Sequence, residues 1–270
     1  MDKDMLKEQK DRIKKKIRKF LLKKGLVPWI PNKSCIEIEI TTACSLACFN
    51  CDRSVRQAPS NEHMFLEQIE RFVKESIELD WKWERITLIG GEPTLHPQLS
   101  ELLKIIKKYK DINNNCMIEI ATNGYGRKVN EILSKLPNWI VIRNSKKESN
   151  TQSFSSYNIA PLDLKEYKNA NFKRGCWVTE RCGLGLSKYG YYPCGAGASI
   201  DRIFGFDVGQ KKLSLVNDAI LKNQLEILCK YCGHYKHNYD AERTTEEKMS
   251  ISWQKAYENY RKTKPNLLLY

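Results

Sequence analysis

A regular alternation of strand-like and helix-like segments between about residues 35 and 180 limits the fold more than any other feature. Residues 35–42 (CIEIEITT) alternate apolar and polar side chains as a strand does, and residues 65–81 place apolar side chains at helical spacing. Further strands are predicted at 85–91, 117–124 and 139–143, and further helices at 98–109 and 128–136. Repeated strand and helix units of this length predict an α/β fold built on a parallel sheet or an open or closed barrel.

Unusual residues follow three of the predicted strands. The first strand leads into "TTACSLACFNCDRS" (residues 41–54), which contains three closely spaced cysteines. The second ends in "GGEPT" (residues 90–94) and the third in "TNG" (residues 122–124). Active sites of parallel α/β folds lie at the carboxyl ends of the strands, so we expect these three loops to meet in one site.

The cysteines at positions 44, 48 and 51 form an incomplete metal site. A structural zinc site needs four ligands and a disulfide needs two cysteines. Three thiolates can hold three irons of a [4Fe–4S] cluster and leave the fourth iron open to a ligand that is not protein. The triplet therefore predicts an open iron–sulfur site.

The CxxxCxxC motif after the first strand, followed by GGEPT after the second, resembles the radical SAM superfamily. The resemblance implies a partial (β/α) barrel over residues 34–174, with Cys44, Cys48 and Cys51 as ligands of a [4Fe–4S] cluster. It also implies that S-adenosylmethionine chelates the open iron. One electron from the reduced cluster then cleaves the cofactor, and the 5′-deoxyadenosyl radical takes a hydrogen atom from a C–H bond.

The same resemblance assigns residues to the cofactor. Glycines at 90 and 91 would allow close approach of the backbone to the methionine group, and Glu92 would accept a hydrogen bond from its ammonium. Asn123 would contact the ribose or carboxylate, although an Asn-Gly turn explains it equally well. Many members of the family carry an aromatic residue where this chain has Asn50, with Phe49 one place earlier. The candidate cofactor-binding residues are Phe49, Asn50, Gly90, Gly91, Glu92, Pro93 and Asn123.

A second group of cysteines surrounds a predicted β-hairpin at residues 184–195, which we expect to turn at Gly190. One cysteine before a hairpin, one after it and a later CxxC resemble the auxiliary-cluster domain called twitch, a shortened relative of the SPASM domain. The implied ligands of a second [4Fe–4S] cluster are Cys176, Cys194, Cys229 and Cys232. Cys182 competes with Cys176 for the first position, and spacing alone also permits a zinc ribbon. Cys35 and Cys116 lie within strand patterns and are expected to be buried apolar side chains.

The expected reaction is dehydrogenation or epimerisation of a sugar-like or aminocyclitol-like small molecule. A fully ligated auxiliary cluster suits electron transfer, and an electron donor such as flavodoxin or ferredoxin is the expected partner. If Cys182 is not a ligand, its thiol could give a hydrogen atom to a substrate radical, which favours epimerisation. The alternatives are a maturase acting on a ribosomally made peptide and a non-enzymatic zinc-binding protein. Polar candidates for substrate contact are Arg143, Tyr191, Tyr192, Asp201 and Arg202.

Charge and composition complete the expected organisation. The chain carries a formal net charge of +14, and residues 1–24 hold eleven Lys or Arg against four Asp or Glu. Residues 1–33 are expected to form a basic amphipathic helix, residues 175–240 the twitch-like domain and residues 241–270 a helical tail. No nucleic-acid motif and no apolar run of transmembrane length occur, and the first residues lack the apolar centre of a signal peptide. These features and the metal-like cysteines predict a cytoplasmic protein.

Overall fold

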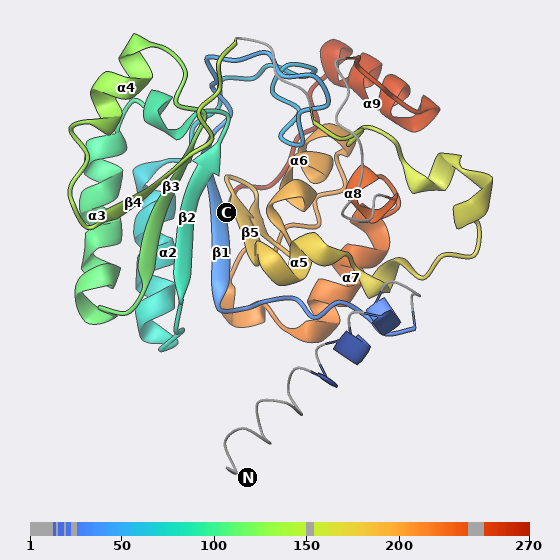
Figure 1. The fold of residues 1–270 in the computed structure, drawn as a ribbon, viewed down its shortest axis with the longest axis horizontal. Coiled ribbons are helices and arrows are strands. Elements are labelled where there is room, and N and C mark those ends of the chain that lie inside the picture. Colours follow the sequence, from blue (N-terminus) through green and yellow to red (C-terminus); the bar gives the residue numbers. More distant parts are fainter. Residues whose placement is uncertain (1–12, 15, 19, 23–25, 150–153, 237–245) are drawn as a thin grey trace.

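The computed structural model describes residues 13, 14, 16–18, 20–22, 26–149, 154–236 and 246–270. Six strands form one sheet in the order β4-β3-β2-β1-β5-β6 (Figure 1). The strands are β1 (Cys35–Thr41), β2 (Arg85–Gly90), β3 (Met117–Thr122), β4 (Ile140–Asn144), β5 (Leu184–Ser187) and β6 (Gly190–Tyr192). Strands β1 to β5 are parallel to their neighbours, and β6 pairs with β5 in antiparallel fashion. The predicted α/β class with a parallel sheet is confirmed.

Two groups of helices flank the sheet (Figure 1). One face carries α2 (Leu66–Glu78), α3 (Leu99–Ile112) and α4 (Arg127–Leu133). The opposite side carries α5 (Trp177–Arg181), α6 (Gly195–Phe204), α7 (Asp218–Leu228), α8 (Gly233–Lys236) and α9 (Ile251–Lys262). Short 3₁₀ turns are η1 (Pro93–Leu95), η2 (Pro161–Asp163), η3 (Lys165–Tyr167), η4 (Phe172–Arg174) and η5 (Leu213–Leu215). None of the helices within these described ranges is both long and apolar enough to cross a membrane.

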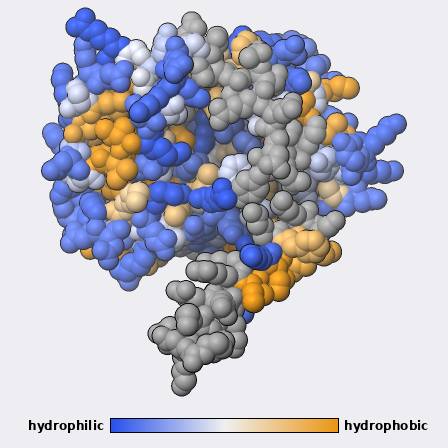
Figure 2. All heavy atoms as spheres, viewed as in Figure 1, coloured by the Kyte–Doolittle hydropathy of each residue, from blue (hydrophilic) through white to orange (hydrophobic). Residues whose placement is uncertain are grey.

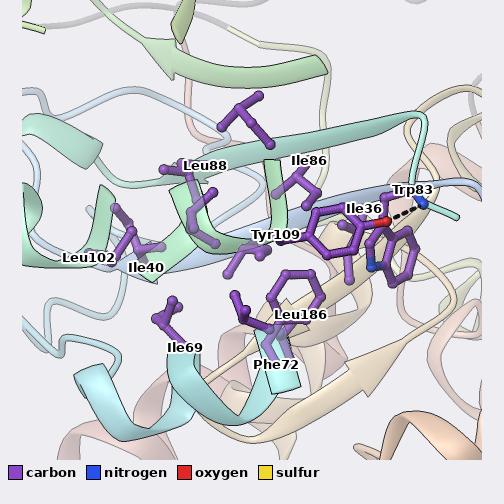
Figure 3. Packing of buried hydrophobic residues seen from close by; sticks show 14 of the residues in the cluster. Ile36, Ile40, Ile69, Phe72, Trp83, Ile86, Leu88, Leu102, Tyr109 and Leu186 are labelled. Carbon is purple, nitrogen blue, oxygen red and sulfur yellow. Dashed lines mark hydrogen bonds between the residues drawn. The ribbon is translucent and has the colours of Figure 1, made fainter. Parts of the chain in front are cut away.

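Strand β1 is buried on both of its faces. Ile36, Ile38 and Ile40 belong to the main core, which they share with apolar side chains of α2 and α3. Figure 3 shows Ile36 and Ile40 in this core. Glu37 and Glu39 alternate with these isoleucines and are also buried. Because successive side chains of a strand point to opposite faces, the two glutamates lie on the face away from α2 and α3. That face carries the candidate site.

The predicted hairpin extends the main sheet instead of forming a sheet of its own. β5 pairs with β1, and the turn to β6 is made by Lys188 and Tyr189. Gly190 begins β6 with φ 127°, and a side chain there would collide with the backbone at Gln210. The glycine is required by this close approach, one position after the turn that it was expected to make.

The C-terminal segment packs into the protein. Helix α9 buries Trp253 and Tyr257 in a second core that also contains Cys176 and Cys194, and Tyr270 reaches the main core. Residues 241–245 of the expected tail, and residues 1–12, 15, 19 and 23–25 of the expected basic helix, lie outside the described residues. The described part of that basic segment, between residues 13 and 22, is helical, and Arg18 forms an ion pair with Glu180 of α5.

Candidate functional site

A cavity of about 390 Å³ opens at the carboxyl ends of β2, β3 and β4, on the sheet face that carries Glu37. All three cysteines of the first motif line it, together with Gly90, Gly91 and Asn123. The expected meeting of the three loops is therefore seen in the structure. A second cavity of about 520 Å³ lies between α3 and α4, but its described lining contains no cysteine. Figure 2 shows hydrophobic side chains gathered near α3 and the edge strand β4, where Val141 and Ile142 are exposed.

The thiols of the first motif are reduced and largely withdrawn from water. None of the ten cysteines forms a disulfide. Burial raises the pKa of Cys44 to about 11 and that of Cys51 to about 12. Metal binding requires thiolates, so a metal at this site must displace protons from these groups.

The two glycines of GGEPT fit the turn against the cysteine loop. A Cβ atom on Gly90 would lie 2.0 Å from the Thr41 carbonyl oxygen, and one on Gly91 would lie 2.3 Å from that of Ala43. The Gly91 amide donates to Thr41 (2.8 Å), and the Glu92 amide donates to Ala43 (2.7 Å). Close backbone approach explains both glycines, and the neighbour approached is the chain leading into Cys44.

Glu92 is fully buried and its carboxylate is held by four protein donors. Oε1 accepts from the Thr94 amide (3.2 Å), the Thr94 hydroxyl (2.9 Å) and the Thr122 hydroxyl (2.8 Å). Oε2 accepts from the Asn123 amide (2.8 Å). Glu92 does not appear among the described residues that line the cavity. The carboxylate therefore joins the ends of β2 and β3, a role that the sequence did not reveal.

Asn123 makes the expected local turn, and its side chain also reaches the cavity. Its side-chain oxygen accepts from the Tyr125 amide (2.7 Å), which makes a local turn before Gly124. Its Nδ2 lies 3.2 Å from the Ser45 hydroxyl and 3.9 Å from the Cys44 sulfur. Asn123 also lines the cavity, so the turn presents this amide to the site.

The other three cofactor candidates lie away from the described cavity lining. Asn50 is buried with φ 52°, and its side chain bonds to the backbone of Glu246 (2.9 Å) and Lys248 (3.0 Å). The Phe49 ring packs under the Arg56 guanidinium at 4.0 Å. Pro93 begins η1. Asn50 thus fastens the cysteine loop to the chain before α9.

Four cysteines of the second group line one small cavity beside α6 and α7. These are Cys176, Cys194, Cys229 and Cys232. All four are buried, and burial raises their pKa values, as do neighbouring cysteines for Cys194, Cys229 and Cys232. The structure therefore brings together the four residues expected to act as auxiliary ligands.

Of the two cysteine-lined cavities, we call the one of about 390 Å³ the larger cavity and the one beside α6 and α7 the smaller cavity. Cys182 lines the larger cavity and does not appear in the described lining of the smaller one. Burial raises its pKa well above the ordinary value, which favours the protonated thiol. It precedes β5 and faces the same cavity as Glu37.

The cysteines at the two cavities can be compared with the ligand sets of metal sites. Within the described ranges, no three His, Cys, Asp or Glu side chains converge as ligands of one metal ion do. The cysteines of a [4Fe–4S] cluster bind different irons and so need not converge on a point. Four thiols line the larger cavity, namely the three of the first motif and Cys182, and four others line the smaller one. An open [4Fe–4S] cluster takes three thiolates from protein and a fully ligated cluster takes four.

Sequence reasoning missed several polar residues of the larger cavity. Asp52, Arg53, Ser145, Lys147, Trp177 and His234 line it. Asp52 and Arg53 directly follow Cys51, His234 follows Cys232 by two positions, and Ser145 follows β4. Their positions next to a cysteine motif or just after a strand are the sequence signal that could have identified them. Of the polar substrate candidates, Arg143 lines the cavity, whereas Tyr191, Tyr192, Asp201 and Arg202 are buried among protein partners.

Residues 38–143 match the sequence profile of the Radical SAM superfamily. Curated relatives include a probable GTP 3′,8-cyclase of Thermoplasma volcanium, 38% identical over 89 residues, which are 33% of this chain and 25% of that protein. Another is a probable GTP 3′,8-cyclase of Methanococcus aeolicus, 35% identical over 33% of this chain and 29% of that protein. This chain thus matches only about a quarter of the length of these relatives.

Two solved structures are similar in part. BtrN in complex with AdoMet and 2-DOIA is 18% identical with a TM-score of 0.47, covering 80% of this chain and 97% of that one. Streptococcus suis SuiB bound to precursor peptide SuiA is 24% identical with a TM-score of 0.32, covering 45% of this chain and 25% of that one.

Proposed function

Because residues 38–143 match the sequence profile of the Radical SAM superfamily, we propose that this protein cleaves S-adenosylmethionine reductively and uses the 5′-deoxyadenosyl radical to take a hydrogen atom from a substrate C–H bond. The observation that carries the proposal is the single cavity lined by Cys44, Cys48, Cys51, Gly90 and Asn123. A [4Fe–4S] cluster bound by the three cysteines would supply the electron for cleavage.

The remaining groups of the cavity suit the polar ends of S-adenosylmethionine. Asn123 offers an amide beside the Cys44 sulfur, and Arg143 and Lys147 offer positive charge for a carboxylate. Arg143 is already paired with Glu119 (2.8 Å), which fixes its position at the end of β4. Glu92 acts through Asn123 and holds the turn in place.

We propose a second [4Fe–4S] cluster at Cys176, Cys194, Cys229 and Cys232, in a twitch-like segment. The support is the common cavity that these four buried thiols line. With every ligand from protein, such a cluster serves electron transfer. A flavodoxin or ferredoxin is the proposed external donor, and a reducing cytoplasm is the compartment in which ten reduced cysteines persist.

The proposed substrate is a sugar-like or aminocyclitol-like small molecule, which the enzyme dehydrogenates or epimerises. The role of the Cys182 thiol distinguishes epimerisation from dehydrogenation. Its position in the larger cavity, apart from the four auxiliary cysteines, favours a thiol that can give a hydrogen atom to a substrate radical and so favours epimerisation. Maturation of a ribosomal peptide is the second candidate, and a zinc-binding protein without activity is the third.

Iron content and cofactor cleavage test the central proposal. Anaerobically reconstituted protein should hold about eight irons and form 5′-deoxyadenosine with a reductant. Replacing Cys44, Cys48 and Cys51 together by Ala should leave about four irons and abolish 5′-deoxyadenosine. Formation of 5′-deoxyadenosine by the triple variant would contradict the assignment of the open cluster, and a zinc-loaded, iron-free protein would contradict both clusters.

A further inference from the structure

Arg53 occupies a buried position between the two cysteine groups. Its side chain is 7% exposed and forms an ion pair with Glu37 of β1 (2.8 Å). The oxygens of Glu39 and Asp52 lie within 4 Å of the guanidinium, at 3.9 Å and 3.8 Å. Arg53, Glu37 and Glu39 are withdrawn from water, whereas Asp52 stays partly exposed. Burying these charged groups is costly unless their hydrogen bonds are completed.

The two terminal nitrogens of the Arg53 guanidinium, Nη1 and Nη2, form a fork of hydrogen-bond donors. One of them has no hydrogen-bond acceptor among the described residues. Nη1 is inaccessible to solvent and unpartnered, whereas Nη2 donates to Glu37. The Glu39 oxygen, 3.9 Å from Nη1, is beyond hydrogen-bonding distance. Nη1 and the facing Glu39 Oε2 are both buried without a hydrogen-bond partner among the described residues. Buried donors are nearly always paired, so Nη1 is available to an acceptor that is not part of the protein.

The position of the fork is set by Gly195, the residue after Cys194. A Cβ atom on Gly195 would lie 2.4 Å from Nη1 and 2.8 Å from Nη2. The guanidinium therefore packs against the bare α-carbon at the start of α6. Only glycine admits it there, which gives a reason for a glycine directly after a proposed cluster ligand.

Both cysteine groups are linked through the same stretch of chain. Arg53 follows Cys51 by two residues and reaches Gly195 beside Cys194. Asp52 lies 3.4 Å from His234, which follows Cys232 by two residues and lines both cavities. Arg53 thus extends from the loop of the first group to the edge of the second.

We propose that Arg53 donates a hydrogen bond from Nη1 to a sulfur of the auxiliary cluster and raises its reduction potential, and that Gly195 is present to admit the guanidinium. The inference rests on the second cluster proposed above. Hydrogen bonds to the sulfurs and nearby charge are two of the features that set the potential of an iron–sulfur cluster. A positive donor stabilises the reduced, more negative cluster, so the auxiliary site becomes a better electron acceptor.

Redox titration of the full chain, followed by electron paramagnetic resonance, tests the proposal. Added S-adenosylmethionine alters the signal of the open cluster, so the unaltered signal reports the auxiliary one. Arg53→Lys keeps the charge but loses the fork, and Gly195→Ala displaces the fork without changing any charge. Both should shift the auxiliary potential to more negative values, by at least a tenfold change in the reduction equilibrium, about 59 mV for one electron.

Two control variants should leave that potential unchanged. Gly126→Ala replaces a glycine where nothing lies within 4 Å of the added carbon, and Gly126 lines neither cysteine-lined cavity among the described residues. Arg71→Lys makes the same chemical change on α2, at an arginine that pairs with Glu75 (3.0 Å). If Arg53→Lys and Gly195→Ala kept their full iron content and an unchanged auxiliary potential, the role of Arg53 would be overturned. The proposed second cluster would not be affected by that result. A wild-type protein with only about four irons would overturn the second cluster, and this inference with it.

Discussion

Glu92→Gln separates a structural role of this carboxylate from direct contact with the cofactor. The substitution keeps Oε1, which accepts from both donors of Thr94 and from the Thr122 hydroxyl. It places an NH₂ group where Oε2 accepts from the Asn123 amide, so two donors face each other in a fully buried position. The Asn123 amide loses its partner and the three remaining bonds lose their charged acceptor.

The cost follows from these contacts. A hydrogen bond to a charged group contributes about 1.5–3 kcal/mol, and leaving a buried donor unpaired costs about 1–3 kcal/mol. These contributions overlap, so we expect a loss of about 3 kcal/mol in the local free energy of opening, which corresponds to a roughly hundredfold change in rate or equilibrium.

Hydrogen exchange measured anaerobically by mass spectrometry checks this value. Peptides that contain the Asn123 amide should exchange about a hundredfold faster in Glu92→Gln than in the wild type. Glu101→Gln makes the same chemical change at an exposed position of α3 and should leave the exchange unaltered. If Glu92→Gln weakened S-adenosylmethionine binding tenfold while exchange at Asn123 stayed unchanged, the carboxylate would contact the cofactor directly and the structural explanation would be refuted.

Three further substitutions test other parts of the site. Cys176→Ala should reduce the iron content to about four per chain, whereas Cys182→Ala should keep about eight. If the protein is an epimerase, Cys182→Ala should also stop the incorporation of solvent deuterium into the product. Formation of 5′-deoxyadenosine should continue in that variant. Gly90→Ala places a methyl group 2.0 Å from the Thr41 carbonyl oxygen, at a residue with φ 151°. It should therefore lower the free energy of unfolding by several kcal/mol. The denaturant midpoint should be lower than that of the control Gly126→Ala, where nothing lies within 4 Å of the added carbon.

Strands and helices of the first half could be predicted because their side-chain periods are regular. The predicted helix at residues 98–109 is seen as Leu99–Ile112, and the predicted strand at 139–143 as Ile140–Asn144. The three cysteines of the first motif could be placed at a common site because parallel strands end at one edge of a sheet. These inferences use only local patterns and a general rule of topology.

The partners of individual polar side chains could not be predicted in this way. Glu92 follows two glycines at a strand end, yet its four donors come from residues up to 31 positions away. Asn50 belongs to the cysteine motif, yet it bonds to residues almost 200 positions later, beyond α8. Such partners depend on the packing of segments that are distant in the sequence.

Strand β1 shows how a regular pattern can mislead about the environment of charged residues. In CIEIEI, the alternation of isoleucine and glutamate is typical of a strand with one face in solvent. The structure instead buries Glu37 and Glu39 on the face that bounds the larger cavity, next to Arg53. Buried carboxylates need a nearby positive charge or hydrogen-bond donors to offset the cost of leaving water. Here the positive charge is that of Arg53, in the loop that follows Cys51. The polar face of β1 is therefore part of the site, and the charge of Arg53 is held between the two cysteine groups by the strand on which the sheet is built.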